Sequence, residues 1–243
     1  MGILDTVQLT KRFGGLQAVV DLTIELNDGE ILGLIGPNGA GKTTVFNCLS
    51  GFLAPDEGTI LFHGEPIRGL QPFQISLMGL ARTFQIVKPF LTIPVLDNVL
   101  IGALTREKSI KKARSQAMEI LEFTGLTPYA DKEAQGLPLP LRKRLELARA
   151  LATQPDVLLL DEVMAGLNPT EVDELIELIR EINQQGISIL LIEHVMRGVM
   201  ALSERMVVIN YGRKIAEGSP QEVVKDQGVI EAYLGKEFLG AQG

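Results

Sequence analysis

The sequence contains little cysteine and no tryptophan. Its one cysteine, Cys48, excludes an intramolecular disulfide framework and suits a reducing compartment. Cys48 lies a few residues beyond a glycine-rich stretch, at the expected start of a helix. We therefore expect it to be a buried core residue rather than a redox switch.

Long apolar runs are also missing, because no stretch approaches the roughly 18 residues needed to span a bilayer. The N-terminus carries Asp5 before any apolar core, so a secretory signal is not expected. Met1, Gly2 and Thr6 formally match a myristoylation pattern, but no polybasic second signal follows. We expect no direct membrane insertion, so any membrane role would depend on a partner.

Positive charge is outnumbered by negative charge, with 23 Lys and Arg residues against 30 Asp and Glu residues. The formal net charge is −7 and the isoelectric point is about 5.0, which argues against a nucleic-acid-binding surface. The 243 residues are 46% hydrophobic and 22% charged, an ordinary globular composition. This length allows one large domain, or a core with a subdomain.

A glycine-rich stretch, residues 36–44, follows the apolar run Ile31 to Ile35 and precedes a helical pattern. A strand, this loop and a helix in that order form the phosphate-binding P-loop, in which backbone N–H groups surround the phosphates. Lys42 is expected to reach the β- and γ-phosphates, and the Thr43 hydroxyl to bind Mg²⁺. The candidate nucleotide-binding residues are Gly36, Asn38, Gly39, Ala40, Gly41, Lys42, Thr43 and Thr44.

Two later apolar strands end in polar residues. Val157 to Leu160 runs into Asp161 and Glu162, and Ile187 to Ile192 is followed by Glu193 and His194. Ligands of open α/β sheets bind beyond the carboxyl ends of strands. Asp161 therefore suits the Mg²⁺ side, and Glu162 suits a group that polarises the attacking water. A solvated strand end and a structural histidine are the alternatives.

Two further positions allow either a functional or a purely structural interpretation. Phe13 is placed in a loop, between Arg12 and Gly14, where it is either a partly buried aromatic or a platform for a purine ring. The P-loop favours the platform. Gln85 ends an expected strand over residues 81–85, and periodicity does not separate a functional residue from a solvated strand end.

The fold class that these patterns predict is α/β, a P-loop NTPase (RecA-like) core with an N-terminal antiparallel β subdomain and an inserted α-helical subdomain. Asn27 to Gly29 has the composition of a hairpin turn, and Arg205 to Glu217 that of a closing hairpin. Asn168 and Pro169 are typical of a helix start. We expect a nucleotide-binding core over 1–85 and 154–225, a helical subdomain over 86–153 and a C-terminal tail over 226–243.

Helical spacing recurs within the expected insertion. It covers Val95 to Leu104, Ser109 to Phe123 and Leu141 to Ala152. The second of these helices is expected to bury one face that comprises Ile110, Ala113, Ala117, Ile120 and Leu121.

In this order, Phe13, residues 36–44, Gln85, a helical insertion, Asp161-Glu162 and His194 resemble an ABC-transporter ATPase subunit over essentially the whole chain. Residues 11–19, 79–85 and 162–171 are similar to the ATPases of branched-chain amino-acid importers. Residues 231–235 are similar to the same group and to lipopolysaccharide-export ATPases.

The resemblance implies ATP and Mg²⁺ as cofactors and a role for each matching residue. Phe13 would stack on adenine, and residues 39–44 would hold the phosphates. Gln85 and Asp161 would serve Mg²⁺, with Gln85 also reporting the nucleotide state to a permease. Glu162 would act as the base, and His194 would steady the γ-phosphate and the water.

The resemblance also implies a cytoplasmic chain, bound to the inner face of the membrane through integral-membrane permease subunits. Members of this family pair head to tail with a second ABC ATPase subunit, with ATP between the two chains. An importer ATPase for branched-chain or other hydrophobic amino acids is the leading interpretation. A regulatory nucleotide-binding subunit with weak hydrolysis, or a lipid- or lipopolysaccharide-export ATPase, is the alternative. A soluble ABC protein acting on nucleic acid is a third.

The sequence departs from the family at its signature, where Leu-Ser-Gly-Gly-Gln is usual and residues 137–141 read Leu-Pro-Leu-Pro-Leu. Pro138 has no hydroxyl, and Pro140 removes a backbone donor. The amides of Leu139, Leu141 and Arg142 are expected to remain. Because the signature serves the ATP of the opposite chain, a hetero-pair would keep one competent site, whereas a homodimer would have two weakened sites.

Two single positions depart as well. Asn168 replaces the usual aspartate at the dimer-facing loop, and Val195 stands where an acid often follows the histidine.

Overall fold

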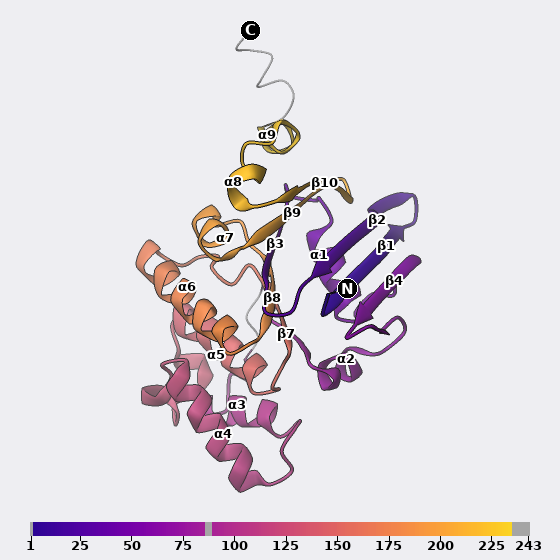
Figure 1. Ribbon diagram of the computed structural model, residues 1–243. Coiled ribbons are helices and arrows are strands. Elements are labelled where there is room, and N and C mark those ends of the chain that lie inside the picture. Colours follow the sequence, from indigo (N-terminus) through magenta and orange to yellow (C-terminus); the bar gives the residue numbers. More distant parts are fainter. Residues whose placement is uncertain (1, 86–88, 235–243) are drawn as a thin grey trace.

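A mostly parallel sheet lies at the centre of the molecule, with the strand order β10-β9-β3-β8-β7-β6 (Figure 1). The computed structural model describes residues 2–85 and 89–234. Met1, the first three residues of the expected insertion (86–88) and the end of the expected tail (235–243) lie outside the described residues. The sheet comprises β3 (Ile31–Ile35), β6 (Leu80–Arg82), β7 (Val157–Asp161), β8 (Ser188–Ile192), β9 (Arg205–Asn210) and β10 (Arg213–Gly218).

The central strands are apolar because both faces of the sheet are covered. All residues of β3, β7 and β8 are buried. Along β7, Val157 and Leu159 pack on one side, in a cluster that includes α1 (Lys42–Leu49). Leu158 and Leu160 pack on the other side, against α5 (Leu139–Leu151) and α6 (Pro169–Gln184). Strands that are buried on both faces therefore hold the loops at their ends in fixed positions.

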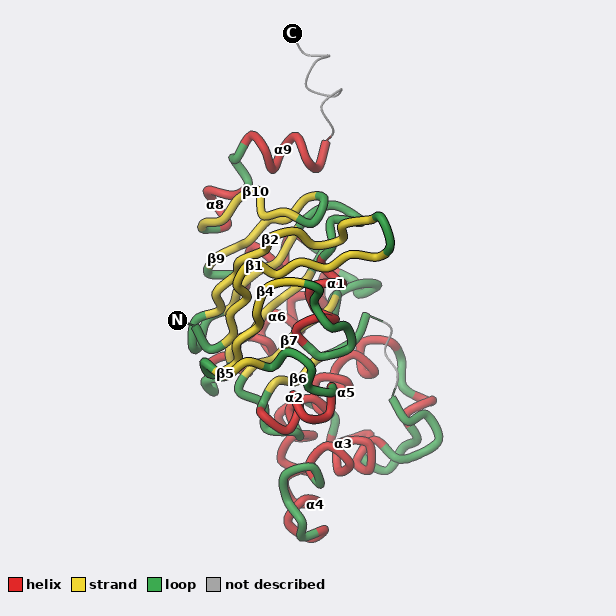
Figure 2. The backbone as a smooth tube through the Cα atoms, turned by 90° about the vertical axis from the view of Figure 1, so that its right-hand side faces the viewer, coloured by secondary structure: helices red, strands yellow, loops and turns green. Residues whose placement is uncertain are grey.

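A second, antiparallel sheet covers α1 from the outside (Figures 1 and 2). Its strand order is β2-β1-β4-β5, which agrees with the expected N-terminal β subdomain. The strands are β1 (Leu4–Phe13), β2 (Leu16–Leu26), β4 (Glu57–Phe62) and β5 (Glu65–Pro66). The two longest, β1 and β2, have 10 and 11 residues.

Three local predictions are wrong. The turn at residues 27–29 joins β2 to β3, which belong to different sheets, so it closes no hairpin. Phe13 is the last residue of β1 and does not lie in a loop. The strand expected over 81–85 ends at Arg82, and Gln85 lies beyond it.

Helices α3 (Val95–Ala103) and α4 (Ile110–Phe123) form a lobe with α5 at the bottom of Figure 1. The lobe has a hydrophobic cluster of its own, from Val95 to Ala152. Ala113, Ala117 and Leu121 are buried as expected, but Ile110 is 68% exposed because the inward face of α4 begins only after its first turn. The domain limits at 86 and 153 stay a prediction.

The Asn168 cap of α6 is confirmed. Its side chain accepts a hydrogen bond from the Glu171 amide at 3.0 Å, and Glu171 accepts one from the Asn168 amide at 2.8 Å. The buried residues of this helix are Val172, Leu175, Ile176, Leu178, Ile179 and Ile182.

The C-terminal part of the chain packs on β9. It contains α7 (Met196–Leu202), α8 (Pro220–Val223) and α9 (Gln227–Leu234). Helix α2 (Pro72–Met78) precedes β6, and short 3₁₀ turns cover Thr127–Tyr129 and Ala134–Gly136. Within the described residues, no helix is long and apolar enough to cross a membrane.

Candidate functional site

The P-loop leaves β3 and enters α1 through a crowded passage. A Cβ atom at Gly36 would lie 2.1 Å from the Ile209 carbonyl oxygen, and one at Gly41 would lie 2.3 Å from that of Ala18. Gly41 also has φ of +108°, a backbone conformation that favours glycine. Both glycines are therefore required by the path of the chain.

Lys42 lies inside this loop. Its Nζ donates hydrogen bonds to the carbonyl oxygens of Gly36 at 2.6 Å and Pro37 at 3.1 Å, and the residue is 6% exposed. Burial lowers the pKa of Lys42, while the charges of Glu162 and Asp161 act to raise it. The field of both carboxylates thus reaches this amine.

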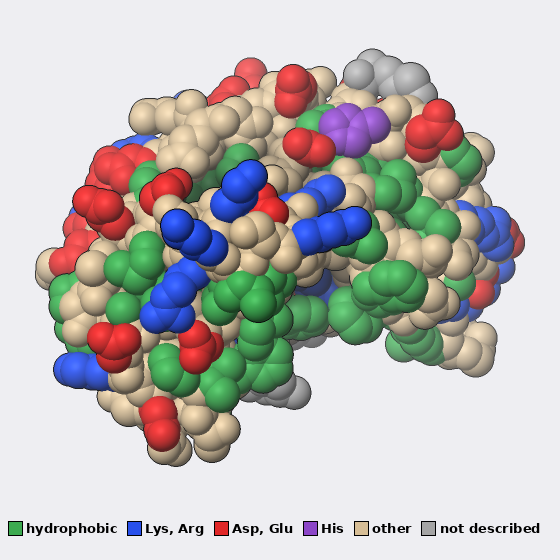
Figure 3. Space-filling view, turned by 90° about the horizontal axis from the view of Figure 1, so that it is seen from below, with side chains coloured by type: hydrophobic (Ala, Val, Ile, Leu, Met, Phe, Trp, Pro, Cys, Tyr) green, Lys and Arg blue, Asp and Glu red, His purple; other side chains and the backbone are tan. Residues whose placement is uncertain are grey.

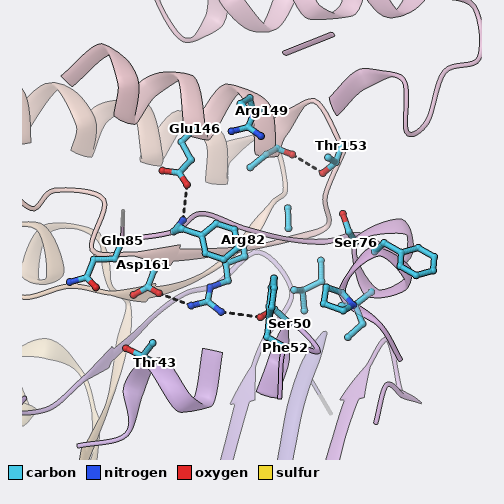
Figure 4. A pocket seen from close by; sticks show the side chains of 17 residues that line it. Thr43, Ser50, Phe52, Ser76, Arg82, Gln85, Glu146, Arg149, Thr153 and Asp161 are labelled. Carbon is cyan, nitrogen blue, oxygen red and sulfur yellow. Dashed lines mark hydrogen bonds and ion pairs between the residues drawn. The ribbon is translucent and has the colours of Figure 1, made fainter. Parts of the chain in front are cut away.

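The other candidate nucleotide-binding residues differ in exposure. Asn38, Gly39 and Thr43 are exposed at the loop surface, Thr44 is half-buried and Ala40 is buried. The Thr43 side chain faces a cleft that Asp161 and Gln85 also line (Figure 4). Phe13 is 46% exposed and carries Lys11 Nζ at 5.7 Å from its ring centroid. Its role in adenine stacking stays a prediction.

The polar residues after β7 and β8 reach the same edge of the sheet as the P-loop. β8 pairs in parallel with both β3 and β7, so the carboxyl ends of all three strands lie together. The amide of Glu162 donates to the Ile192 carbonyl at 2.9 Å, which ties the two later strand ends to each other.

Three of the candidate residues meet at the Glu162 carboxylate. Its Oε2 accepts a hydrogen bond from Gln85 Nε2 at 2.7 Å, and its Oε1 lies 3.1 Å from His194 Nε2. The Glu162 side chain is 16% exposed. Its backbone has φ of +50°, which is uncommon for a residue with a side chain and is held by the surrounding contacts.

Asp161 has a partner that the sequence did not reveal. Its Oδ2 accepts from Arg82 Nη2 at 2.8 Å, and both side chains are at most 6% exposed. Arg82 Nη1 donates to Asn47 Oδ1 at 2.7 Å and to Ser50 Oγ at 3.1 Å, and Figure 4 shows the second of these contacts. The guanidinium also lies 5.0 Å from the Phe84 ring. The sequence signal for this buried ion pair was the position of Arg82, a charged residue at the end of the short apolar strand β6.

Helix α5 contributes two more buried charges that sequence reasoning missed. Lys143 Nζ donates to the Glu162 carbonyl at 2.9 Å, and Glu146 Oε1 accepts from the Phe84 amide at 2.8 Å. Burial lowers the pKa of Lys143 and raises that of Glu146 to about 7. The two residues lie three positions apart, which places them on one face of the helix among buried neighbours. This spacing was the sequence signal for two buried charges.

Glu193 is buried one residue before His194. Its carboxylate accepts from the backbone amides of Met164 at 2.6 Å and His194 at 3.2 Å. Burial nevertheless raises its pKa. Glu193 therefore fixes the backbone that carries the histidine.

The N-terminus of α5 coincides with the unusual signature. Pro138 is the N-cap and makes no side-chain capping bond, and Pro140 lies in the first turn. The Arg142 amide donates to the Pro138 carbonyl at 3.0 Å within the helix. The expectation that this amide stays available is therefore wrong, and the amides of Leu139 and Leu141 are those left.

Oxygen atoms suited to Mg²⁺ border the cleft. No group of three or more His, Cys, Asp or Glu side chains that could hold a metal occurs in the described parts of the chain. Thr43, Gln85 and Asp161 nevertheless all line one cleft, and magnesium commonly binds to few protein oxygens together with substrate phosphates. This donor set fits Mg²⁺.

A family model described as ABC transporter matches residues 19–165. The chain belongs to the ABC transporter family. It is therefore an ABC-type ATPase, and the family resemblance drawn from its motifs is confirmed. A second model, described as branched-chain amino acid ATP-binding cassette transporter, matches residues 213–238.

Individual relatives of this ABC ATPase agree over nearly the full length. It is 44% identical to the high-affinity branched-chain amino acid transport ATP-binding protein LivG of Escherichia coli strain K12, over 96% of this chain and 98% of that protein. It is 33% identical to the lipopolysaccharide export system ATP-binding protein LptB of Haemophilus influenzae, over 98% and 99%. A crystal structure of the ADP conformation of MJ1267, an ATP-binding cassette of an ABC transporter, superposes with a TM-score of 0.88 at 33% identity. The match covers 97% of this chain and 100% of that structure's chain.

Proposed function

We propose that this chain hydrolyses ATP to drive an importer of branched-chain or other hydrophobic amino acids, from the cytoplasmic face of a permease. The observation that carries the proposal is the meeting of Gln85, Glu162 and His194 at the P-loop edge of the sheet. The amino-acid substrate is supported by the 44% identity to LivG and by the C-terminal match. The lower identity to LptB makes lipopolysaccharide export the weaker candidate.

The chain's own residues suggest how hydrolysis is arranged. Lys42 exchanges its bonds to the loop carbonyls for the terminal phosphates, which its cationic form favours. Glu162 accepts the proton of the attacking water. Gln85 and His194 each hold one oxygen of that carboxylate, so its orientation is set before the substrate arrives.

Mg²⁺ would be held by Thr43, Gln85 and Asp161, and when bound it supplies charge neutralisation at the phosphates. Gln85 uses its amide nitrogen on Glu162, so its carbonyl oxygen is the atom left for the metal side. Arg82 occupies Oδ2 of Asp161, which leaves Oδ1 for this purpose. Phe13 would stack on the adenine ring.

The second ATPase subunit is proposed to differ from this chain. The signature helix α5 offers the opposite nucleotide only the amides of Leu139 and Leu141, together with the positive end of its dipole. Losing one preorganised donor costs roughly 10²–10³ in rate. A partner with a complete signature would close the P-loop of this chain productively, whereas a second copy would not.

The permease is proposed to bind at the cleft beside Arg82. The cleft has a volume of about 690 Å³, and the exposed rings of Phe52, Phe73 and Phe84 line it. From below, the molecule is hollowed between two lobes and hydrophobic side chains gather around the hollow (Figure 3). Exposed apolar surface of this kind favours a protein partner. Gln85 borders the same cleft, so it connects that partner to Glu162.

Turnover of the transporter assembled with its permease tests the proposal. Glu162→Gln should reduce ATP hydrolysis by at least about 100-fold, because the amide cannot accept a proton. Binding of ATP should persist. Equal turnover of wild type and variant would reject the role of Glu162. Two assays in proteoliposomes separate the alternatives. ATP-dependent uptake of labelled leucine supports the importer, and ATP-dependent extraction of lipid supports the exporter.

The two signature prolines favour a second candidate, a regulatory subunit that closes on ATP but hydrolyses it poorly. It predicts low turnover that rises when Ser is restored at 138 and Gly at 140, and unchanged turnover would reject it.

A further inference from the structure

Helix α5 touches the proposed catalytic region at two points that lie one turn apart. Lys143 Nζ donates to the backbone carbonyl of Glu162 at 2.9 Å. Glu146 Oε1 accepts from the backbone amide of Phe84, the residue before Gln85, at 2.8 Å. In Figure 4 the Glu146 side chain points from the helix to the backbone next to Gln85.

These two side chains are buried although both are ionisable. Lys143 is 4% exposed and Glu146 is 7% exposed. Burying a charged group is costly unless it gains specific partners, and here each group gains a single bond to the backbone rather than a bidentate ion pair. An apolar pair of similar size would pack on this face at less cost, so packing alone does not explain them.

The contacts form a closed circuit. Glu146 holds the Phe84 amide, Gln85 donates to Glu162 Oε2 at 2.7 Å, and Lys143 holds the Glu162 carbonyl. The circuit therefore begins and ends on α5, the helix that starts at the signature. A shift of α5 along its axis would pull on both sides of the Gln85–Glu162 pair at once.

We propose that Lys143 and Glu146 are positioning residues that link the placement of the signature helix to the alignment of Glu162 and Gln85. The proposal rests on the catalytic role of Glu162 proposed above. It assigns no contact with ATP to either residue. Docking of α5 against the core aligns the carboxylate, and displacement of α5 releases it.

Matched variants of Glu146 test the link in the transporter assembled with its permease and partner subunit. Glu146→Ala removes the acceptor, and kcat should fall between about 10-fold and 100-fold while KM for ATP stays unchanged. Glu146→Gln keeps an oxygen at this place and should stay within about threefold of the wild type. Lys143→Met should resemble Glu146→Ala. Glu174→Ala is the control. It removes an exposed ion pair between Glu174 of α6 and Arg144 of α5, and it should leave kcat unchanged.

The hydrogen-exchange rate of the Phe84 amide is a second measurement. It reports directly on the bond to Glu146, which a general loss of stability would not affect selectively. The amide should be protected in the wild type and in Glu146→Gln, and should exchange faster in Glu146→Ala. The proposal is overturned if Glu146→Gln loses as much kcat as Glu146→Ala, or if Glu146→Ala exposes the amide and keeps full kcat. Neither result changes the expected inactivity of Glu162→Gln, so failure of this link and failure of the proposed function remain distinguishable.

Discussion

Gln85 Nε2 lies 2.7 Å from Oε2 of Glu162, so the residue expected to sense Mg²⁺ also touches the proposed base. The other oxygen of that carboxylate faces His194 at 3.1 Å. The carboxylate is thus held from both sides by groups on two different segments. Changes at Gln85 should consequently alter both the rate and its pH dependence.

The first prediction concerns Gln85. Gln85→Ala should lower kcat about 10-fold by freeing one oxygen of Glu162. Gln85→Glu should lower it further and shift the acid limb of the pH–rate profile to higher pH, because a like charge raises the pKa of a neighbouring carboxyl. Steady-state ATPase assays from pH 5 to pH 9 measure both effects. Gln227→Ala, on the surface of α9, is the control.

Arg82 offers a test of stability. Arg82→Ala leaves the buried Asp161 carboxylate without its ion pair, and the free energy of unfolding should fall by about 3–5 kcal/mol. Glu177→Ala, which breaks an exposed pair with Arg180 and leaves the bond from Arg180 to the Ala201 carbonyl in place, should cost less than about 1 kcal/mol. Urea unfolding followed by circular dichroism compares them. Similar losses in both variants would contradict the structural role of the buried pair.

A third prediction follows from the two prolines at the signature. Restoring Ser at 138 and Gly at 140 returns a hydroxyl and a backbone donor, and turnover should rise about 10-fold or more when two copies of this chain are paired. The same change should have little effect on the P-loop of this chain when a complete partner signature faces it. Unchanged turnover in the homodimer would refute the view that these prolines weaken the opposite site.

Glu146 predicts a pH dependence of stability. Burial raises its pKa from 4.5 to about 7, against the opposing effects of Phe84, Arg149 and Lys143, while Asp161 acts in the same direction as burial. The folded state then binds more protons than the unfolded state between these values, so stability falls as pH rises from about 4.5 to 7.

Glu146→Gln should remove this contribution. The unfolding free energy of the variant minus that of the wild type should be about 1–3 kcal/mol higher at pH 8 than at pH 4. Thermal or urea unfolding at both pH values gives the difference. A pH-independent difference between the two proteins would mean that Glu146 titrates alike in the folded and unfolded states.

Cys48 should react slowly. Burial raises the pKa of this thiol to about 11, and the residue is 2% exposed, so little thiolate is available at neutral pH. The native protein should therefore resist a thiol reagent such as DTNB, and should label within minutes in urea. Rapid labelling of the native form would point to local opening around α1.

Much of the candidate site could be predicted because each residue follows a strong sequence signal. The P-loop has a fixed spacing, and Asp161, Glu162 and His194 each follow a run of buried aliphatic residues. Parallel pairing of β3, β8 and β7 then brings these strand ends together. The α/β fold class and the family are confirmed, whereas the catalytic roles stay predictions.

The missed residues depend on contacts between distant segments. Arg82 pairs with Asp161 across 79 positions, and Lys143 meets the Glu162 carbonyl across 19. Neither contact leaves a periodic trace, because a buried charge interrupts the apolar pattern instead of extending it. The hairpin at residues 27–29 failed for a related reason: a turn sequence records the local bend and not the sheet that the next strand joins.

The left-handed backbone at Glu162 has a consequence for protein engineering. At φ of +50°, a β-branched residue would be strained, so the useful replacements at this position are restricted to unbranched or small ones. A glycine would relax the turn while removing the proton acceptor. Glycine would also leave Gln85 and His194 without their shared partner, whereas the unbranched Glu162→Gln keeps a side chain between them. Glu162→Gln is therefore the better starting point for trapping nucleotide-loaded complexes.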